Sequence, residues 1–183
     1  MVPRPSNAQN LSPLRSFNVL GGYSFTSVQF LGKTANSQTQ ILSFGYQQKI
    51  RDYPNQKTLW YTADIIPYLH YQYPKRDEGD RFVRRSGFGF SPVGFMLKKS
   101  TSNIVTPFFR TSGGIIYMEN EFPTDQSRRL NFTFDVTAGG NLHITPNIFI
   151  SFGYKFHHIS NAQTGSENPG LDSNFLFLKL SLQ

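Results

Sequence analysis

A histidine and a serine near the C-terminus have the types and the spacing that ester hydrolysis by a hydroxyl nucleophile needs. The chain contains four histidines, and two of them, His157 and His158, precede Ser160 in an alternating segment. Residues i and i+2 of a strand share a face and lie about 6.5 Å apart, so the His158 imidazole can act as general base for the Ser160 hydroxyl. His157 points to the opposite face, and His70 and His143 are interpreted as histidines without a catalytic role.

Asp172 is the predicted acid of the same group. It follows the loop 163–170, which returns the chain beside His158 if the two flanking strands are antiparallel neighbours. An acid at that place orients the imidazole and stabilises the imidazolium. Glu167 and Asp135 are the competing carboxylates, but Glu167 lies mid-loop and Asp135 lies on the opposite strand face. His158, Ser160 and Asp172 are therefore the candidate triad.

The segments that carry these residues alternate between apolar and polar side chains, as half-buried strands do. Alternation is clearest in 130–142, 148–156 and 173–182, is present in 42–46 and 59–71, and is weaker in 16–25, 86–97 and 104–118. These segments predict about eight strands. His158 and Ser160 share the apolar face of their strand, and Asp172 shares the parity of a Leu-rich face.

The connections between these strands alternate in length. Those near 26–37, 73–86, 119–129 and 161–170 are long and polar, whereas those near 50–57, 98–103 and 143–147 are shorter. Alternating strands with long loops at one rim and short turns at the other are typical of an outer-membrane barrel. A soluble barrel also alternates, so periodicity alone leaves both architectures open.

Composition narrows the class of protein. The chain has 183 residues, a net charge of +7, no cysteine and 15% aromatic residues. The lack of cysteine excludes disulfides and Cys-based metal sites. The charge suits an anionic lipid surface, while the scattered basic residues without a nucleic-acid motif argue against nucleic acid as a partner. No apolar run reaches the roughly 20 residues of a membrane-spanning helix, and no signal peptide is recognisable at the start.

We expect residues 1–183 to form one domain, with residues 1–15 as a flexible N-terminal segment. The polar strand faces carry Asp64, Asp135, Lys155 and His157, which are expected to pair with one another.

The runs 158–162 (His-Ile-Ser-Asn-Ala) and 168–172 (Asn-Pro-Gly-Leu-Asp) resemble the C-terminal active-site signature of the lipid A 3-O-deacylase (PagL) family of acyloxyacyl hydrolases. The resemblance is strong over about 30 residues, 153–182, and the rest of the chain agrees in length and strand organisation. It implies an all-β fold, an eight-stranded antiparallel up-and-down transmembrane barrel in the outer membrane of a Gram-negative bacterium. It also implies hydrolysis of an ester-linked acyl chain of lipid A at the 3-position, without metal or cofactor.

The same resemblance assigns roles to single residues. It places the triad on His158, Ser160 and Asp172, where a known member of the family has glutamate at the acidic position, so the acid here is one methylene shorter. Asn161 corresponds to the oxyanion-hole asparagine, a backbone amide near Gln163 completes that hole, and Asn168 is a supporting loop residue.

Substrate contacts are expected from the apolar face and from the basic loops. Phe156 shares the face of His158, so we expect it to contact lipid. The arginines of the long connections are candidates for the phosphates of lipid A, namely Arg81, Arg84, Arg85, Arg128 and Arg129. Lipopolysaccharide and outer-membrane lipids are the expected partners, and the oligomeric state is left open. The competing interpretations are a non-catalytic outer-membrane barrel and a soluble lipocalin-like lipid-binding barrel.

Overall fold

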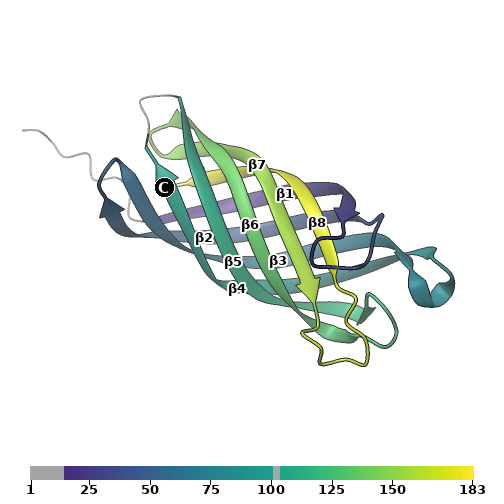
Figure 1. Cartoon of the computed structure of the whole chain (residues 1–183). Helices are drawn as coiled ribbons and strands as arrows, with labels where there is room; N and C mark the ends of the chain where they lie inside the picture. The colour runs from purple at the N-terminus through teal and green to yellow at the C-terminus, as the bar shows by residue number, and fades with distance from the viewer. Residues whose placement is uncertain (1–14, 101–103) are drawn as a thin grey trace, which may run out of the picture.

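The chain forms a closed barrel of eight antiparallel strands in the computed structural model, which describes residues 15–100 and 104–183 (Figure 1). The strands are β1 (Arg15–Val28), β2 (Gln38–Tyr53), β3 (Lys57–Lys75), β4 (Arg81–Lys99), β5 (Val105–Phe122), β6 (Arg128–Thr145), β7 (Ile148–Ser160) and β8 (Leu171–Leu182). Each strand pairs with the next one in sequence, and β8 pairs with β1, so no strand edge is left open. The predicted eight-stranded up-and-down barrel is confirmed.

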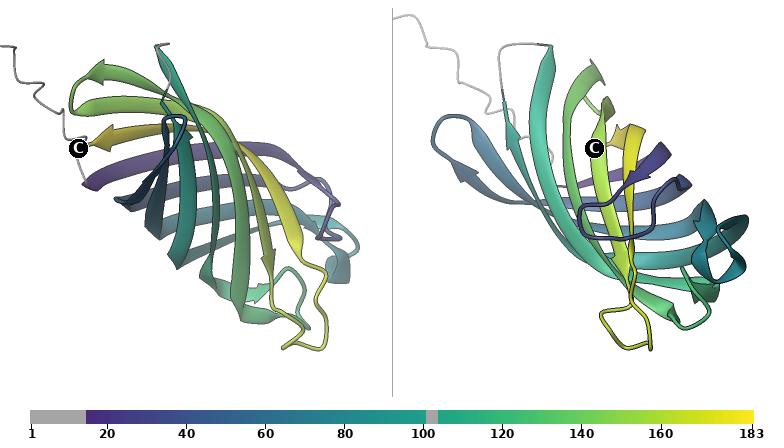
Figure 2. Two further views of the ribbon diagram at one scale, coloured as in Figure 1. Left: turned by 60° about the vertical axis from the view of Figure 1, so that its left-hand side comes forward. Right: turned by 45° about the vertical axis from the view of Figure 1, so that its right-hand side comes forward.

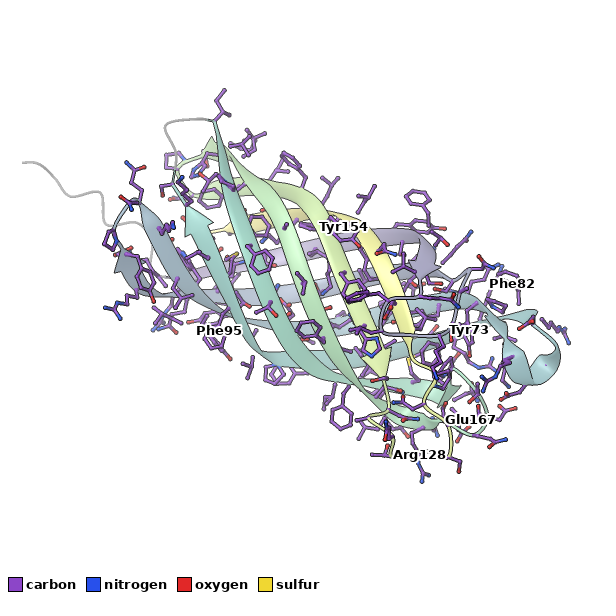
Figure 3. The ribbon with its side chains drawn as sticks, in the orientation of Figure 1. Tyr73, Phe82, Phe95, Arg128, Tyr154 and Glu167 are labelled. Carbon is purple, nitrogen blue, oxygen red and sulfur yellow. The ribbon has the colours of Figure 1, made fainter. Side chains whose placement is uncertain are left out.

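The outer wall of the barrel is apolar and its lumen is polar. Side chains such as that of Phe95 project outward from the wall (Figure 3). The exposed apolar side chains form a belt around the barrel: Phe17, Val19, Leu42, Phe44, Ile65, Phe88, Phe90, Phe95, Phe109, Ile115, Phe132, Phe134, Ile150, Phe152, Leu176, Leu178 and Leu180. A soluble lipid-binding barrel would turn its apolar face inward. The outward belt excludes that alternative and is typical of a membrane-spanning barrel.

The two ends of the barrel differ in their connections (Figures 1 and 2). The long-loop end carries the loops 29–37, 76–80, 123–127 and 161–170, and the short-turn end carries the connections after β2, β4 and β6 together with the C-terminus. The segments 73–86 and 119–129, expected to be loops, are largely strand, because β3 pairs with β4 as far as Lys75 and Arg81 and β5 extends to Phe122. Those polar residues extend the hairpins beyond the apolar belt, where alternation is no longer required.

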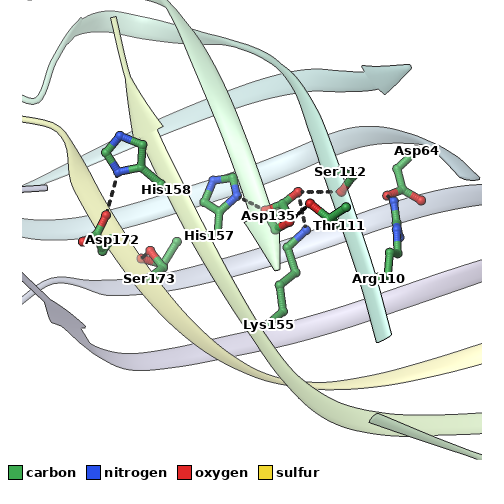
Figure 4. Close-up of polar contacts among 11 residues, drawn as sticks. Asp64, Arg110, Thr111, Ser112, Asp135, Lys155, His157, His158, Asp172 and Ser173 are labelled. Atoms are coloured by element: carbon green, nitrogen blue, oxygen red, sulfur yellow. Dashed lines mark hydrogen bonds and ion pairs between the residues drawn. The ribbon is translucent and has the colours of Figure 1, made fainter. Parts of the chain in front are cut away.

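The lumen holds buried ion pairs, shown in Figure 4. Asp135 accepts from His157 Nδ1 at 2.6 Å and from Lys155 Nζ at 3.0 Å, as expected from their shared strand face. The expectation that Asp64 belongs to the same group was wrong, because its carboxylate pairs with Arg110 of β5. Sequence parity identifies inward residues, but only the barrel's shear decides which of them meet.

The expected flexible segment 1–15 falls outside the described residues except for Arg15, which is the first residue of β1. Within the described part of the chain, no helix is both long enough and apolar enough to cross a membrane.

Candidate active site

The register between β7 and β8 places His158 directly opposite Asp172. His158 Nδ1 lies 2.6 Å from Asp172 Oδ1, a short contact of the kind expected between an imidazole and a carboxylate (Figure 4). The His158 side chain is 16% exposed on the outer wall, whereas Asp172 is fully buried. The dyad therefore lies at the long-loop edge of the apolar belt, with the imidazole accessible from outside the barrel.

Three consecutive backbone amides hold the other oxygen of Asp172. The N–H groups of Phe30, Leu31 and Gly32 donate to Asp172 Oδ2 at 2.9, 2.7 and 2.9 Å. We call this arrangement the three-amide clamp. Hydrogen bonds to an ionised carboxylate are roughly twice as strong as neutral ones, so the clamp fixes the acid and stabilises its charge. Sequence reasoning missed the clamp because it uses backbone groups, which carry no side-chain signal.

The loop 29–37 reaches Asp172 because the β1–β8 register shifts between Ser24 and Ser27, just before the loop begins. Such an irregularity bends a strand and redirects the chain that follows. The loop then runs beside the start of β8: Lys33 N–H donates to the Pro169 carbonyl at 2.6 Å, and Thr34 bridges Leu171.

Two glycines permit this close approach. A Cβ at Gly32 would lie 2.7 Å from the Leu171 backbone nitrogen, and a Cβ at Gly170, whose φ is +60°, would lie 3.0 Å from His158 Cε1. Glycine at these two positions therefore lets the loops 29–37 and 161–170 pack closely around Asp172.

The same geometry explains how the short side chain of Asp172 reaches the imidazole. Asp172 has the outward parity predicted from the sequence, but the loop 29–37 covers it and removes it from solvent. The direct pairing of Asp172 with His158 already brings its carboxylate to hydrogen-bonding distance. The shorter side chain therefore reaches the imidazole without displacing either strand.

Ser160 is the last residue of β7, two residues beyond His158 on the same outward face. It pairs with Phe132 of β6, whose ring is exposed beside it. Between Ser160 and His158 no hydrogen bond forms in the described residues, so the structure joins His158 with Asp172 but leaves the hydroxyl of Ser160 unbonded. Catalytic hydrogen bonds are often long in the absence of substrate, and this spacing keeps Ser160 a candidate.

The chain turns sharply after Ser160. Ala162 and Gln163 have φ values of 51° and 62°, in the left-handed region. Asn161 supports the turn: its backbone N–H donates to Asn168 Oδ1 at 3.0 Å, and its Nδ2 donates to the Glu167 carbonyl at 2.7 Å. One Nδ2 hydrogen of Asn161, which is buried, and the backbone N–H of Gln163, which is exposed, have no acceptor in the part of the chain described.

The loop 161–170 is fastened to its neighbours. Glu167 pairs with Arg76 at 2.6 Å, and its N–H donates to the Gln126 carbonyl at 3.1 Å. Arg128 Nε donates to the Thr164 carbonyl at 3.0 Å, and Figure 3 shows Arg128 and Glu167 together at the long-loop end. Glu167, which was expected to lie in the middle of the loop, therefore anchors the loop through these contacts.

The predicted substrate residues do not all converge on the dyad. Phe156 lies against the exposed Phe30, with ring centroids 5.9 Å apart, and the two rings extend the apolar wall beside His158. Arg129 Nε bonds the Met118 carbonyl and its guanidinium lies over Tyr117.

Arg84 and Arg85 belong to β4, which pairs with neither β7 nor β8. Arg84 points outward and its guanidinium is unbonded in the described residues, whereas Arg85 bonds the Arg84 carbonyl. Arg81, the first residue of β4, is exposed.

A second serine and histidine meet elsewhere on the outer wall. His70 Nδ1 lies 2.9 Å from Ser86 Oγ, but no carboxylate contacts His70 among the described residues. This pair therefore lacks the acid that distinguishes the His158 dyad, and it offers a matched comparison for it. Within residues 15–100 and 104–183, no three His, Asp or Glu side chains are grouped so as to hold a metal ion.

Comparisons with known proteins agree with this geometry. The chain resembles the crystal structure of the outer membrane enzyme PagL at a TM-score of 0.66 and 19% identity, over 88% of this chain and 97% of that one. It resembles Neisserial surface protein A at a TM-score of 0.57 and 11% identity, over 93% of this chain and 97% of that one. It resembles the E. coli outer membrane protein W at a TM-score of 0.50 and 11% identity, over 92% of this chain and 97% of that one.

No curated protein sequence matches the chain directly. The sequence model of the lipid A 3-O-deacylase (PagL) family matches residues 36–181. The chain belongs to the lipid A 3-O-deacylase (PagL) family, and it is a lipid A deacylase built on an outer-membrane β-barrel.

Proposed function

We propose that the protein is a serine esterase that removes the 3-O acyl chain of lipid A, with Ser160 as nucleophile, His158 as general base and Asp172 as the orienting acid. The observation that carries the proposal is the buried carboxylate of Asp172, held by the three-amide clamp and bonded to His158 at 2.6 Å on the outer wall. A clamped acid next to an accessible imidazole is the arrangement that a general base requires.

The reaction begins when the ester carbonyl of the acyl chain lies against Ser160. Asp172 holds the proton of His158 on Nδ1, which leaves Nε2 free to accept the Ser160 hydroxyl proton as Oγ attacks the carbonyl carbon. The imidazolium that forms is stabilised by Asp172, whose charge the clamp maintains. Covalent catalysis of this kind divides one difficult hydrolysis into two easier steps.

The negative charge that develops on the carbonyl oxygen needs hydrogen-bond donors. The backbone N–H of Gln163 and the second Nδ2 hydrogen of Asn161 are the proposed donors, and the bonds from Asn161 to Asn168 and Glu167 hold them in place. His158 then returns the proton to the departing sugar oxygen, which leaves an acyl-serine. Water, activated by the same imidazole, releases the fatty acid and regenerates Ser160.

The location of the dyad suits a substrate that stays in the membrane. The apolar wall below His158 includes Tyr154, Phe152 and Leu176, so the acyl chain can lie along it while the sugar remains at the long-loop end. We therefore place the site in the outer leaflet of a Gram-negative outer membrane, where lipopolysaccharide is found, and Arg128, which lies beside the loop 161–170, is a proposed contact for its phosphates.

Mass spectrometry of lipid A after incubation with purified protein in detergent tests the proposal. Wild-type protein should release one acyl chain from the 3-position, and Ser160→Ala should reduce the rate by about 10⁴-fold or more. Ser86→Ala is the matched control, because it removes a hydroxyl that bonds a histidine without an acid. The proposal fails if Ser160→Ala retains wild-type activity, or if the lost chain comes from another position.

A further inference from the structure

The half of the lumen near the short-turn end carries more positive charge than its carboxylates balance. Lys98 and Lys179 point inward there, and neither makes an ion pair with a carboxylate in the described residues. Asp64 attracts Lys179 but is already bonded to Arg110. Lys98 and Arg110, which are positively charged, both repel Lys179. Buried charges that lack a partner are costly, so these two cations call for an anion.

The surroundings of the two lysines supply donors and few acceptors. Lys98 Nζ lies 4.0 Å from the Trp60 ring centroid and 3.3 Å from Gln47 Oε1, and Lys179 Nζ lies 4.8 Å from the Phe108 ring centroid. Aromatic rings accept a cation weakly and do not neutralise its charge.

Two further donors beside Lys98 are buried and unbonded, namely Ser16 Oγ and Gln47 Nε2. Ser16 is 1% exposed and Gln47 is 2% exposed, and the two are register partners on β1 and β2. Buried polar side chains normally have partners, so two donors left open in one place indicate an absent acceptor.

A cavity of about 490 Å³ adjoins these groups at the short-turn end. Lys98, Trp60 and Ser16 line it, together with hydroxyl and amide side chains that include Thr58, Asn141 and Ser181. It is bounded by residues of the last turn and by Gln183, so it opens away from the catalytic dyad.

We propose that this cavity is a binding site for a small inorganic oxyanion such as phosphate, held by Lys98 with Ser16 and Gln47 and attracted by the charge of Lys179. Water can accept hydrogen bonds from the open donors, but it cannot neutralise two ammonium groups. The anion would stabilise the barrel from inside, independently of deacylation, because the site lies in the lumen at the short-turn end and the dyad lies on the outer wall at the long-loop end.

Trp60 is the single tryptophan of the chain and touches Lys98, so its fluorescence reports on the site. Wild-type protein in a zwitterionic detergent should show a saturable fluorescence change with inorganic phosphate at constant ionic strength, and equilibrium dialysis should give one phosphate per chain. Each tenfold increase in phosphate above the Kd should raise the folding equilibrium constant about tenfold.

Lys98→Met should abolish these responses, whereas Lys99→Met, which removes the exposed neighbouring lysine, should keep them. A response to phosphate that does not saturate in wild-type protein, or that is equal in Lys98→Met, would overturn the proposal. Lys98 and Lys179 would then be solvated by water and bind no anion. If Lys98→Met does not fold, the wild-type dialysis experiment decides alone.

Discussion

Replacing Gly32 with alanine should disrupt the three-amide clamp while the rest of the barrel stays folded. A Cβ at this position would lie 2.7 Å from the Leu171 nitrogen and 2.9 Å from the Gly170 carbonyl carbon, both of them backbone atoms that cannot rotate away. In Gly32→Ala the loop 29–37 must therefore move outward by about 0.7 Å to restore an ordinary contact distance of 3.4 Å. That movement lengthens the bonds to Asp172 Oδ2, which now measure 2.7 to 2.9 Å, beyond hydrogen-bonding range.

The expected effect on catalysis follows from the misplaced imidazole. A displacement of about 1 Å at a catalytic group costs roughly 10²-fold in rate, which corresponds to about 2.7 kcal/mol. We expect kcat/KM of Gly32→Ala to fall by about 10²-fold, with the loss in kcat, because the clamp holds Asp172 and does not touch the substrate. Overpacking should lower the stability of the barrel by about 1–3 kcal/mol, which leaves the protein folded.

The assay is initial-rate deacylation of lipid A in detergent, with the folded fraction measured by gel mobility without heating. Gly113→Ala is the control, because its Cβ would meet only the Thr133 carbonyl oxygen at 3.5 Å and it lies on β5, which β6 separates from the strand of His158. If Gly32→Ala deacylates within threefold of the wild-type rate while folded, the clamp does not set the orientation of the acid.

Asp172→Glu, which lengthens the acid by one methylene, should lower kcat/KM about tenfold, because the added methylene must displace His158 or leave the clamp. An unchanged or higher rate would show that the site tolerates either length. Asp135→Asn should lower the free energy of unfolding in urea by about 3 kcal/mol, because it removes the carboxylate that pairs with Lys155, while the rate per folded protein stays unchanged. A loss below 0.5 kcal/mol would contradict this prediction. Arg128→Gln should raise KM about threefold at constant kcat through a lost phosphate contact, and equal KM values in the two proteins would remove Arg128 from the substrate site.

The sequence determined the architecture and the chemical candidates. Alternation at period two fixes which side chains share a face, so the barrel, the shared face of His158 and Ser160 and the opposite face of His157 could be predicted from single residues. The loop 163–170, which returns the chain beside His158, predicted Asp172 as the acid, and the family signature added the supporting asparagines to the prediction. The length of the strands near 73–86 and 119–129 escaped prediction, because hairpins that extend beyond the lipid belt lose the apolar alternation on which strand prediction depends.

Only the tertiary structure decided what surrounds these residues. The parity of Asp172 predicts a lipid-facing carboxylate, yet the loop 29–37 buries it, because closure of β1 against β8 and the irregularity after Ser24 bring three backbone amides to one oxygen. The partner of Asp64 and the open donors around Lys98 likewise depend on the register around the whole barrel. Local alternation specifies a face, whereas long-range pairing specifies a neighbour, and the acid of this site is held by a neighbour about 140 residues away in the chain.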